Sequence, residues 1–347
     1  MKASILRKLL RGPAKINRYV SSRALILLYH RIAEADSDPW QLAVTPGHFE
    51  EHLQILSRFG RIMPLHGLAV AVQRGTLPRR AVIVTFDDGY ADNLSNAKPL
   101  LQKYEVPATV FITTGYTGED REFWWDELDK LFLQPGALPS DLTLSVNGTE
   151  YHWELGEGNV YEDASLACNL GWKAWQENDP TSRHSIYRSL WSLMHPLPDS
   201  KRRQIGDELL EWAGATGSAR PMRRPLSAGE IGELSDGGLI EIGCHTVTHP
   251  QLSKLTSDAQ WREICQSKAS LEEILGKPVA AFAYPYGREC DYTGETMTIV
   301  RNAGFDCACS TSIRVVRRGA DQFQLPRLQV PDVDGDSFAR ILSEWLQ

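Results

Sequence analysis

The sequence has 347 residues, which is long enough for one large α/β domain with an insertion or for two smaller domains. Its composition, with 42% hydrophobic and 23% charged residues, is that of an ordinary globular protein. The formal net charge of −7 at pH 7 gives no reason to expect nucleic-acid binding.

The first 23 residues form a basic arm. They carry seven basic side chains and no acidic one, with apolar residues at roughly helical spacing. This arm could lie on an anionic membrane surface, or it could be a leader helix packed on its own domain. Its apolar runs are shorter than the ~7–15 residues of a secretory signal, and no run in the chain reaches the ~20 residues of a transmembrane helix. We therefore expect a cytoplasmic protein that could contact the inner face of the membrane, with its six cysteines as reduced thiols.

Seven short apolar runs predict buried strands of a parallel sheet, because such strands are continuously hydrophobic. The predicted strands are 24–29, 81–86, 108–113, 239–244, 280–284, 305–309 and 323–330. Amphipathic segments between several of them predict helices at 49–59, 98–104 and 261–275. Repeated β–α units imply a parallel sheet, either open and doubly wound or closed into a barrel.

One connection is much longer than the others. The third and fourth predicted strands are separated by residues 114–238, which are 125 positions, and residues 116–225 hold seven of the ten tryptophans. A structureless connection of that length would be unusual, so we expect a structured insertion. It could be a lid or small subdomain, or an oligomerisation or packing module. The expected organisation is the arm 1–23, a main domain built from 24–115 and 226–347, and the insertion 116–225.

Two adjacent carboxylates, Asp87 and Asp88, follow the second predicted strand in the sequence TFDDG. Neighbouring carboxylates repel each other, and the next residue, Gly89, allows the backbone to turn there. The pair makes sense beside a cation, where one carboxylate binds the ion and the other is held as a base. Asp-Asp-Gly alone also marks ordinary surface turns.

Two histidines, His245 and His249, follow the fourth predicted strand in HTVTH. Four residues apart, they would lie on one face of a helical turn, where Thr246 can hydrogen-bond the backbone. Together with an aspartate from another strand end they would form a His₂Asp set, and catalytic zinc sites use three such protein ligands. The alternative is a pair of surface histidines that cap a helix. A third motif, YPYG at 284–287, predicts a rigid turn that can aim a main-chain N–H outward.

In this order, TFDDG, HTVTH and YPYG resemble the three motifs of the polysaccharide deacetylase family, the nodulation-type homology domain of carbohydrate esterase family 4. The resemblance covers roughly residues 24–115 and 226–331. It implies an α/β fold, a distorted barrel of seven β/α units, here with a large and mostly helical insertion. Functional groups at the carboxyl ends of the strands are what such a barrel requires.

The resemblance also implies residue roles. Asp88, His245 and His249 would hold a divalent metal, most commonly Zn²⁺, with Co²⁺ or Ni²⁺ as alternatives. Asp87 would be the base that activates water, and the main-chain N–H of Tyr286 would help to hold the oxyanion. The implied reaction is hydrolysis of an N-acetyl group from an amino sugar or glycan. The basic arm would suit a lipid-linked substrate, whereas the oligomeric state is not defined by the sequence.

The sequence departs from the family pattern in two places. The arginine that usually orients the base is absent from 281–284, so Arg327 is a candidate substitute and Arg288 is another. The late histidine that usually acts as the general acid is also absent. The remaining candidate is His30 at the end of the first predicted strand, because the first and last strands of a closed barrel are neighbours.

These departures keep other functions open. The chain could be an inactive carbohydrate-binding pseudoenzyme that retains the barrel. It could also be a deformylase or an imidase that uses the same metal site on a different amide.

Overall fold

The computed structural model describes residues 22–346 except residues 60 and 177, and the described chain forms two compact units. One, the insertion unit, comprises Ala35–Gln41 and Glu119–Arg224. The other, the barrel unit, comprises residues 22–34, Leu42–Gly118 and 225–346. The predicted basic arm lies outside the described residues, apart from 22–23. In the described part of the chain, no helix has the length and apolar character needed to cross a bilayer.

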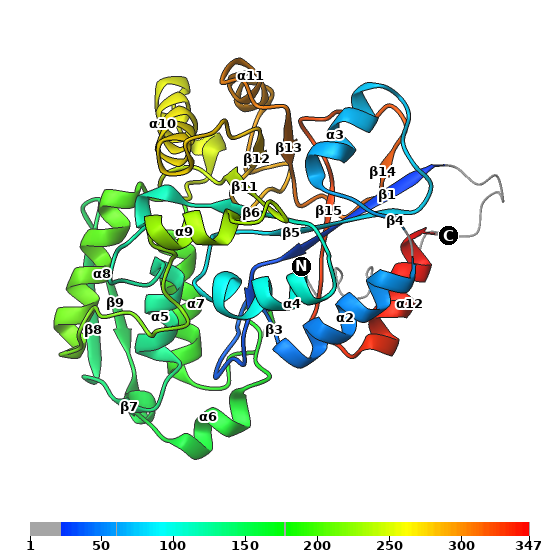
Figure 1. Cartoon of the computed structure of the whole chain (residues 1–347). Coiled ribbons are helices and arrows are strands. Elements are labelled where there is room, and N and C mark those ends of the chain that lie inside the picture. Colours follow the sequence, from blue (N-terminus) through cyan, green and yellow to red (C-terminus); the bar gives the residue numbers. More distant parts are fainter. Residues whose placement is uncertain (1–21, 60, 177, 347) are drawn as a thin grey trace. The chain divides into compact units, whose positions relative to one another are not determined.

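The barrel unit is built on a curled sheet with seven parallel strands in the order β13, β12, β11, β6, β5, β1 and β15 (Figure 1). Their bounds are β1 Arg23–Tyr29, β5 Ala81–Phe86, β6 Ala108–Ile112, β11 Ile240–Cys244, β12 Ala281–Ala283, β13 Cys307–Cys309 and β15 Arg327–Gln329. Each strand falls on one of the seven predicted runs, and the predicted fold class is confirmed. Shorter strands are β2 Arg31–Ile32, β3 Ala43–Val44, β4 Arg61–Ile62 and β14 Val316–Arg317.

The last strand is shorter than predicted, and the reason is local. Pro326 lacks the N–H that a strand residue donates to its neighbour, so β15 starts only after it. Just before it, Leu325 forms a parallel bridge with Cys309, and its N–H donates to the Ala308 carbonyl at 2.9 Å. The chain at 325–329 therefore contacts both β13 and β1, which lie on either side of it.

Helices cover the outside of the sheet (Figure 1). They are α2 Pro46–Phe59, α3 Leu65–Gln73, α4 Lys98–Lys103, α9 Ala228–Ser235, α10 Ser257–Leu275, α11 Gly294–Asn302 and α12 Gly335–Leu346, with single turns η1 Asn93–Ala97, η2 Thr114–Tyr116 and η4 Leu252–Lys254. The three predicted helices are present as α2, α4 and α10. Helix α10 begins earlier than predicted, because Thr256 caps it by accepting from the N–H of Ala259.

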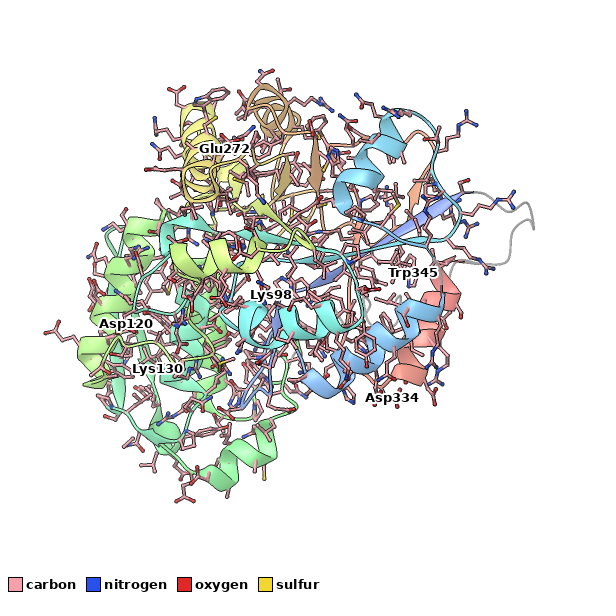
Figure 2. The ribbon with its side chains drawn as sticks, viewed as in Figure 1. Lys98, Asp120, Lys130, Glu272, Asp334 and Trp345 are labelled. Carbon is pink, nitrogen blue, oxygen red and sulfur yellow. The ribbon has the colours of Figure 1, made fainter. Side chains whose placement is uncertain are left out.

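Helices α2 and α12 lie side by side and are joined through one histidine (Figure 1). The buried His52 ring stacks on Phe338 with 4.1 Å between ring centroids. Its Nε2–H donates to the Val333 carbonyl at 2.7 Å, and its Nδ1 accepts from the Tyr29 hydroxyl at 3.2 Å. Asp334, at the surface in Figure 2, caps α12 by accepting from a backbone N–H.

The insertion unit combines helices with short antiparallel strand pairs. Its elements are α5 Trp124–Phe132, β7 Gly136–Ala137, β8 Asp141–Val146, β9 Thr149–Glu154, η3 Gly156–Asn159, β10 Val160–Tyr161, α6 Asp163–Asn169, α7 Ser182–Met194 and α8 Asp199–Ala213. Several of its tryptophans, including Trp124, Trp125 and Trp172, are buried. Its interior also holds charged pairs, such as Arg220 with Glu122 at 2.6 Å.

The barrel-unit residues that flank the insertion lie next to each other. Gly118 N–H donates to the Leu226 carbonyl at 3.3 Å, and Tyr90 forms an antiparallel bridge with Pro225. In turn, Leu226 N–H donates to the Gly89 carbonyl at 3.0 Å. The point where the chain returns to the barrel unit is thus bonded directly to the TFDDG motif.

Candidate metal centre and catalytic residues

The carboxyl ends of β1, β5 and β15 are aligned by the strand register. Tyr29 pairs with Phe86, and Leu28 pairs with Gln329. Residues that immediately follow these strands therefore meet at one end of the sheet, as expected for functional groups of a β/α barrel.

The two adjacent aspartates diverge at a turn. Asp87 continues the β5 ladder, because its N–H donates to the Tyr29 carbonyl at 3.0 Å. The backbone then becomes left-handed at Asp88, with φ 74°, and at Gly89, with φ 80°. A Cβ atom on Gly89 would lie 2.6 Å from Cδ1 of Ile112, which is the end of a flexible side chain, so the left-handed conformation is the main reason for a glycine at this position. The turn directs the two carboxylates to different partners.

The HTVTH segment is a loop, and the predicted helical turn is wrong. Thr246 and His249 have left-handed φ values of 69° and 53°. The N–H groups of Val247 and Thr248 donate to the side chain of Glu263 on α10 rather than to carbonyls within the segment. Thr246 does bond the backbone as predicted, since its Oγ1 accepts from His249 N–H at 3.1 Å.

The loop nevertheless brings His245 and His249 to Asp88. Oδ1 of Asp88 lies 3.6 Å from Nε2 of His245 and 3.5 Å from Nε2 of His249, and all three side chains are buried. Metal–ligand bonds of 2.0–2.1 Å in tetrahedral geometry place neighbouring ligand atoms about 3.3–3.4 Å apart. The donor set and its spacing therefore fit Zn²⁺ or an ion of similar size.

The tautomer of His245 is set by its surroundings. Its Nδ1–H donates to the Ala283 carbonyl at 2.8 Å, which leaves the Nε2 lone pair directed at the site. Burial lowers the pKa of His245, although the nearby Asp87 charge opposes the shift. The ring is thus held in the neutral form that binds metals.

A second group that could hold a cation lies on the β8–β9 hairpin of the insertion unit. Nε2 of His152 is 4.0 Å from Oδ1 of Asp141 and 3.8 Å from Oε1 of Glu154. All three side chains are exposed to solvent, where water competes with them for a cation. The buried group at Asp88 is therefore the stronger candidate.

Asp87 is bound by Arg327 in a two-pronged ion pair. Nη1 and Nη2 of Arg327 each donate to one carboxylate oxygen at 2.7 Å, and its Nε donates to the Ser310 carbonyl at 3.0 Å. Burial alone would raise the pKa of Asp87, but the charge and the hydrogen bonds of Arg327 lower it below its ordinary value. Of the two predicted arginines, Arg327 contacts the base, whereas Arg288 pairs with Asp291 at 2.9 Å.

His30 lies where β1 ends, beside Asp87 by the strand register. Its carbonyl accepts from Asn93 Nδ2 at 2.8 Å, whereas its buried Nδ1 has no hydrogen-bond partner among the described residues. Burial lowers the pKa of His30 to about 4, against the opposing charge of Asp87. His30 is therefore neutral near pH 7 in this structure.

Tyr286 lies beside the same centre. Its ring contacts the His249 ring edge-on, with 4.6 Å between centroids, and its carbonyl accepts from Thr311 Oγ1 at 2.7 Å. Its φ of 59° is left-handed, like those of Asp88, Thr246 and His249. These four are half of the eight non-glycine residues with positive φ in the described chain. Such strained conformations concentrate at functional sites.

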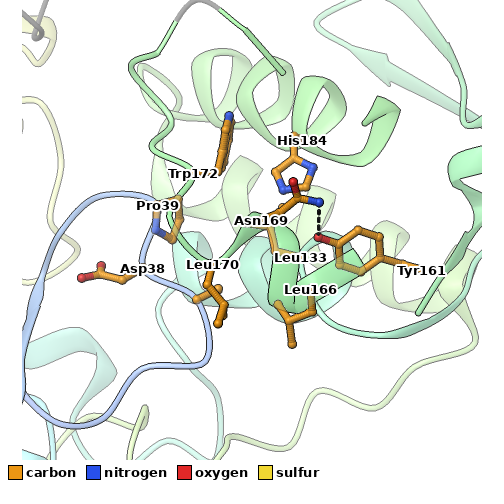
Figure 3. A pocket seen from close by; sticks show the side chains of 10 residues that line it. Asp38, Pro39, Leu133, Tyr161, Leu166, Asn169, Leu170, Trp172 and His184 are labelled. Atoms are coloured by element: carbon orange, nitrogen blue, oxygen red, sulfur yellow. Dashed lines mark hydrogen bonds between the residues drawn. The ribbon is translucent and has the colours of Figure 1, made fainter. Parts of the chain in front are cut away.

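A recess in the insertion unit has a different character (Figure 3). Leu170 and Trp172 supply apolar walls, and Tyr161 accepts from Asn169 Nδ2 at 3.2 Å. The recess contains none of the residues predicted for catalysis.

The fold and the site together define a β/α-barrel protein with a candidate metal centre at the carboxyl ends of its strands. The polysaccharide deacetylase family model matches residues 74–135 and 212–308. YxkH of Bacillus subtilis (strain 168), assigned to the polysaccharide deacetylases, is 36% identical over 316 residues, which cover 90% of this chain and 74% of that protein. The chain belongs to the polysaccharide deacetylase family.

Other similar proteins include the poly-beta-1,6-N-acetyl-D-glucosamine N-deacetylase of Staphylococcus aureus (strain MRSA252), which is 30% identical over 135 residues. That match covers 35% of this chain and 47% of the relative, so it spans about half the relative's length.

Two solved structures share the fold. The Streptococcus pyogenes deacetylase PplD in complex with acetate has a TM-score of 0.57 at 18% identity, with 93% of this chain and 99% of that chain covered. IcaB from Ammonifex degensii has a TM-score of 0.57 at 20% identity, with 94% and 97% covered.

Proposed function

We propose that this protein is a metal-dependent carbohydrate N-deacetylase, which hydrolyses the N-acetyl group of an amino sugar or glycan. The proposal rests on one observation, which is that two adjacent carboxylates have different partners. The left-handed turn directs Asp88 to two imidazoles and leaves Asp87 on a buried arginine. Amide hydrolysis needs both a cation to polarise the carbonyl and a separate group to accept a proton from water.

Asp88, His245 and His249 would hold the ion, most commonly Zn²⁺ in this family. When bound, the ion supplies Lewis-acid polarisation of the acetamide carbonyl and a lowered pKa of water. Asp87 takes a proton from the water whose oxygen attacks the carbonyl carbon. Arg327 fixes both oxygens of that carboxylate, so the base faces the reacting atoms in one orientation.

The leaving nitrogen must receive a proton when the C–N bond breaks into acetate and amine. We assign this proton to His30. Because His30 is neutral at rest, it must take up a proton from solvent before the C–N bond breaks, and the negative charge that develops on the carbonyl oxygen as water attacks favours its protonated form. The main-chain N–H of Tyr286 is the proposed hydrogen-bond donor to that oxygen.

The substrate class follows from the family and its named relatives. The Staphylococcus aureus relative is named for poly-beta-1,6-N-acetyl-D-glucosamine, and we propose an N-acetylated glycan of related chemistry here. Three points stay predictions: a lipid-linked form of the substrate, a cytoplasmic location near the membrane, and a lid role for the insertion unit.

The test is acetate release from oligomers of N-acetylglucosamine by protein stripped with a chelator and reloaded with Zn²⁺, Co²⁺ or Ni²⁺. Asp87→Asn should keep the metal but lose about 10²–10⁴-fold in rate, because the proton acceptor is gone. Asp306→Asn, at an exposed carboxylate away from the centre, is the matched control and should keep the wild-type rate.

Each other result has a defined meaning. Release of formate but not acetate from matched amides would indicate a deformylase. Sugar binding without turnover would indicate the pseudoenzyme, and a protein that binds no metal would refute the proposal. His30→Ala at near-normal rate would remove His30 from the mechanism.

A further inference from the structure

The loop that carries both histidines is held from two sides. On one side, the N–H groups of Thr114 and Gly115 donate to the carbonyls of Thr246 and Val247, at 3.1 and 2.7 Å. On the other side, the N–H groups of Val247 and Thr248 are directed toward α10. The loop's own hydrogen bond, from His249 N–H to Thr246 Oγ1, leaves the Val247 and Thr248 peptide groups to be positioned by α10.

Glu263 receives those N–H groups. Its Oε2 accepts from Val247 N–H at 2.9 Å and from Thr248 N–H at 2.8 Å, and its Oε1 accepts from the Thr248 hydroxyl at 2.7 Å. Hydrogen bonds to an ionised carboxylate are stronger than neutral ones. The half-buried Glu263 side chain thus fixes the direction of the N–H groups of Val247 and Thr248, which lie between the two predicted histidine ligands.

The side chain comes from a firmly anchored element. Helix α10 is capped at its start by Thr256 and buries Ile264, which directly follows Glu263, in the main core. Glu263 can therefore transmit the position of the helix to the loop. Side chains held by such packing place functional groups more accurately than loops do alone.

We propose that Glu263 is a positioning residue for the metal centre, which holds the HTVTH loop in the shape that directs His245 and His249 to one ion. The inference rests on the proposed function, because it requires that this centre binds a metal. The loop keeps Thr246 and His249 in left-handed conformations, which are unfavourable for residues with a side chain. Without the carboxylate, the freed N–H groups would bond water and the loop would relax, which separates the two imidazoles.

The test is titration of metal-free protein with Co²⁺, followed by the visible absorption bands that report its coordination geometry. Glu263→Ala should weaken Co²⁺ binding by about 10–100-fold, as loss of a group that orients metal ligands does, and should change the band intensities. Glu263→Gln should recover much of the affinity, because one amide oxygen can still accept from both N–H groups. Glu273→Ala, at an exposed position on the same helix, should bind Co²⁺ like the wild type.

The outcomes separate the two proposals. If the wild type binds no Co²⁺, the proposed function and the positioning role both fall. If the wild type binds Co²⁺ and Glu263→Ala binds it with the same affinity and spectrum, only the positioning role is wrong. If Glu263→Ala does not fold, Glu263→Leu takes its place, because it fills the space without accepting a hydrogen bond: weakened Co²⁺ binding supports the role, and wild-type affinity and spectrum refute it.

Discussion

The buried pair of Asp87 and Arg327 offers the sharpest test of the barrel interior. Arg327 is fully buried, and Asp87 is only 3% exposed. We consider Arg327→Met, which keeps the length and apolar packing of the side chain but removes its charge. The variant leaves Asp87 as a buried carboxylate that has lost both of its 2.7 Å hydrogen bonds to the arginine, and it leaves the Ser310 carbonyl without the Nε donor.

The expected loss is large. Removing one partner of a buried ion pair typically destabilises a protein by about 3–5 kcal/mol, because the remaining charge is uncompensated. Domains of this kind have a total unfolding free energy of only about 5–15 kcal/mol. In the double variant Asp87→Asn with Arg327→Met, neither charge remains. Its loss should therefore be smaller than the sum of the two single losses, by about 1–3 kcal/mol.

The assay is urea unfolding of the metal-free protein at pH 7, followed by far-ultraviolet circular dichroism. Arg301→Met is the matched control, because Arg301 forms an exposed pair with Asp321 at 2.8 Å. Exposed pairs contribute about 0–1 kcal/mol, so this control should unfold nearly as the wild type does. The reasoning is refuted if Arg327→Met is no less stable than the control, or if the two single losses simply add in the double variant.

Two further perturbations test other parts of the barrel unit. Burial lowers the pKa of His52 to about 4, whereas an unfolded imidazole titrates near 6.5. The unfolded chain therefore binds more protons between these values, and the unfolding free energy should fall by up to about 3 kcal/mol as the pH drops from 6.5 to 4. A His52→Gln variant should lose this part of the pH dependence, and equal slopes in the two proteins would contradict it. Gly115→Ala would place a Cβ atom 2.6 Å from the Val247 carbonyl oxygen and should displace the HTVTH loop, which weakens Co²⁺ binding. Gly229→Ala has open space around its Cβ position and should leave the affinity unchanged.

The strands of the barrel could be predicted from the sequence because both faces of a parallel sheet are covered. In β1, for example, Ala24 to Tyr29 are all buried, so the strand is an unbroken apolar run. Such a run can be identified as a strand without knowing which strands lie beside it. The end of the sheet was harder to predict. The run 323–330 mixes apolar residues with Gln324, Arg327 and Gln329, and Pro326 divides it into a bridge to β13 and a strand beside β1.

The site was predictable only as far as local motifs reach. Asp87, Asp88, His245 and His249 stand in short motifs, and the strand register brings their motifs to one end of the sheet. The shape of the HTVTH loop depends on Glu263, which lies on a helix 14 positions after His249. In the sequence, Glu263 looks like any other acid on the solvent face of an amphipathic helix, so no local pattern could reveal its contacts.

The contact between Gly118 and Leu226 has a consequence for engineering. The insertion leaves and re-enters the barrel unit at residues that are hydrogen-bonded to each other, so a shorter loop can join the same two points. The entropic cost of closing such a loop changes only slowly with its length. A Gly-Ser bridge between residues 118 and 225 would keep the Leu226–Gly89 bond that braces the aspartate turn, but a design of this kind must also replace Ala35–Gln41, which belongs to the insertion unit. Domains from other proteins can be joined to the barrel unit at the same two residues.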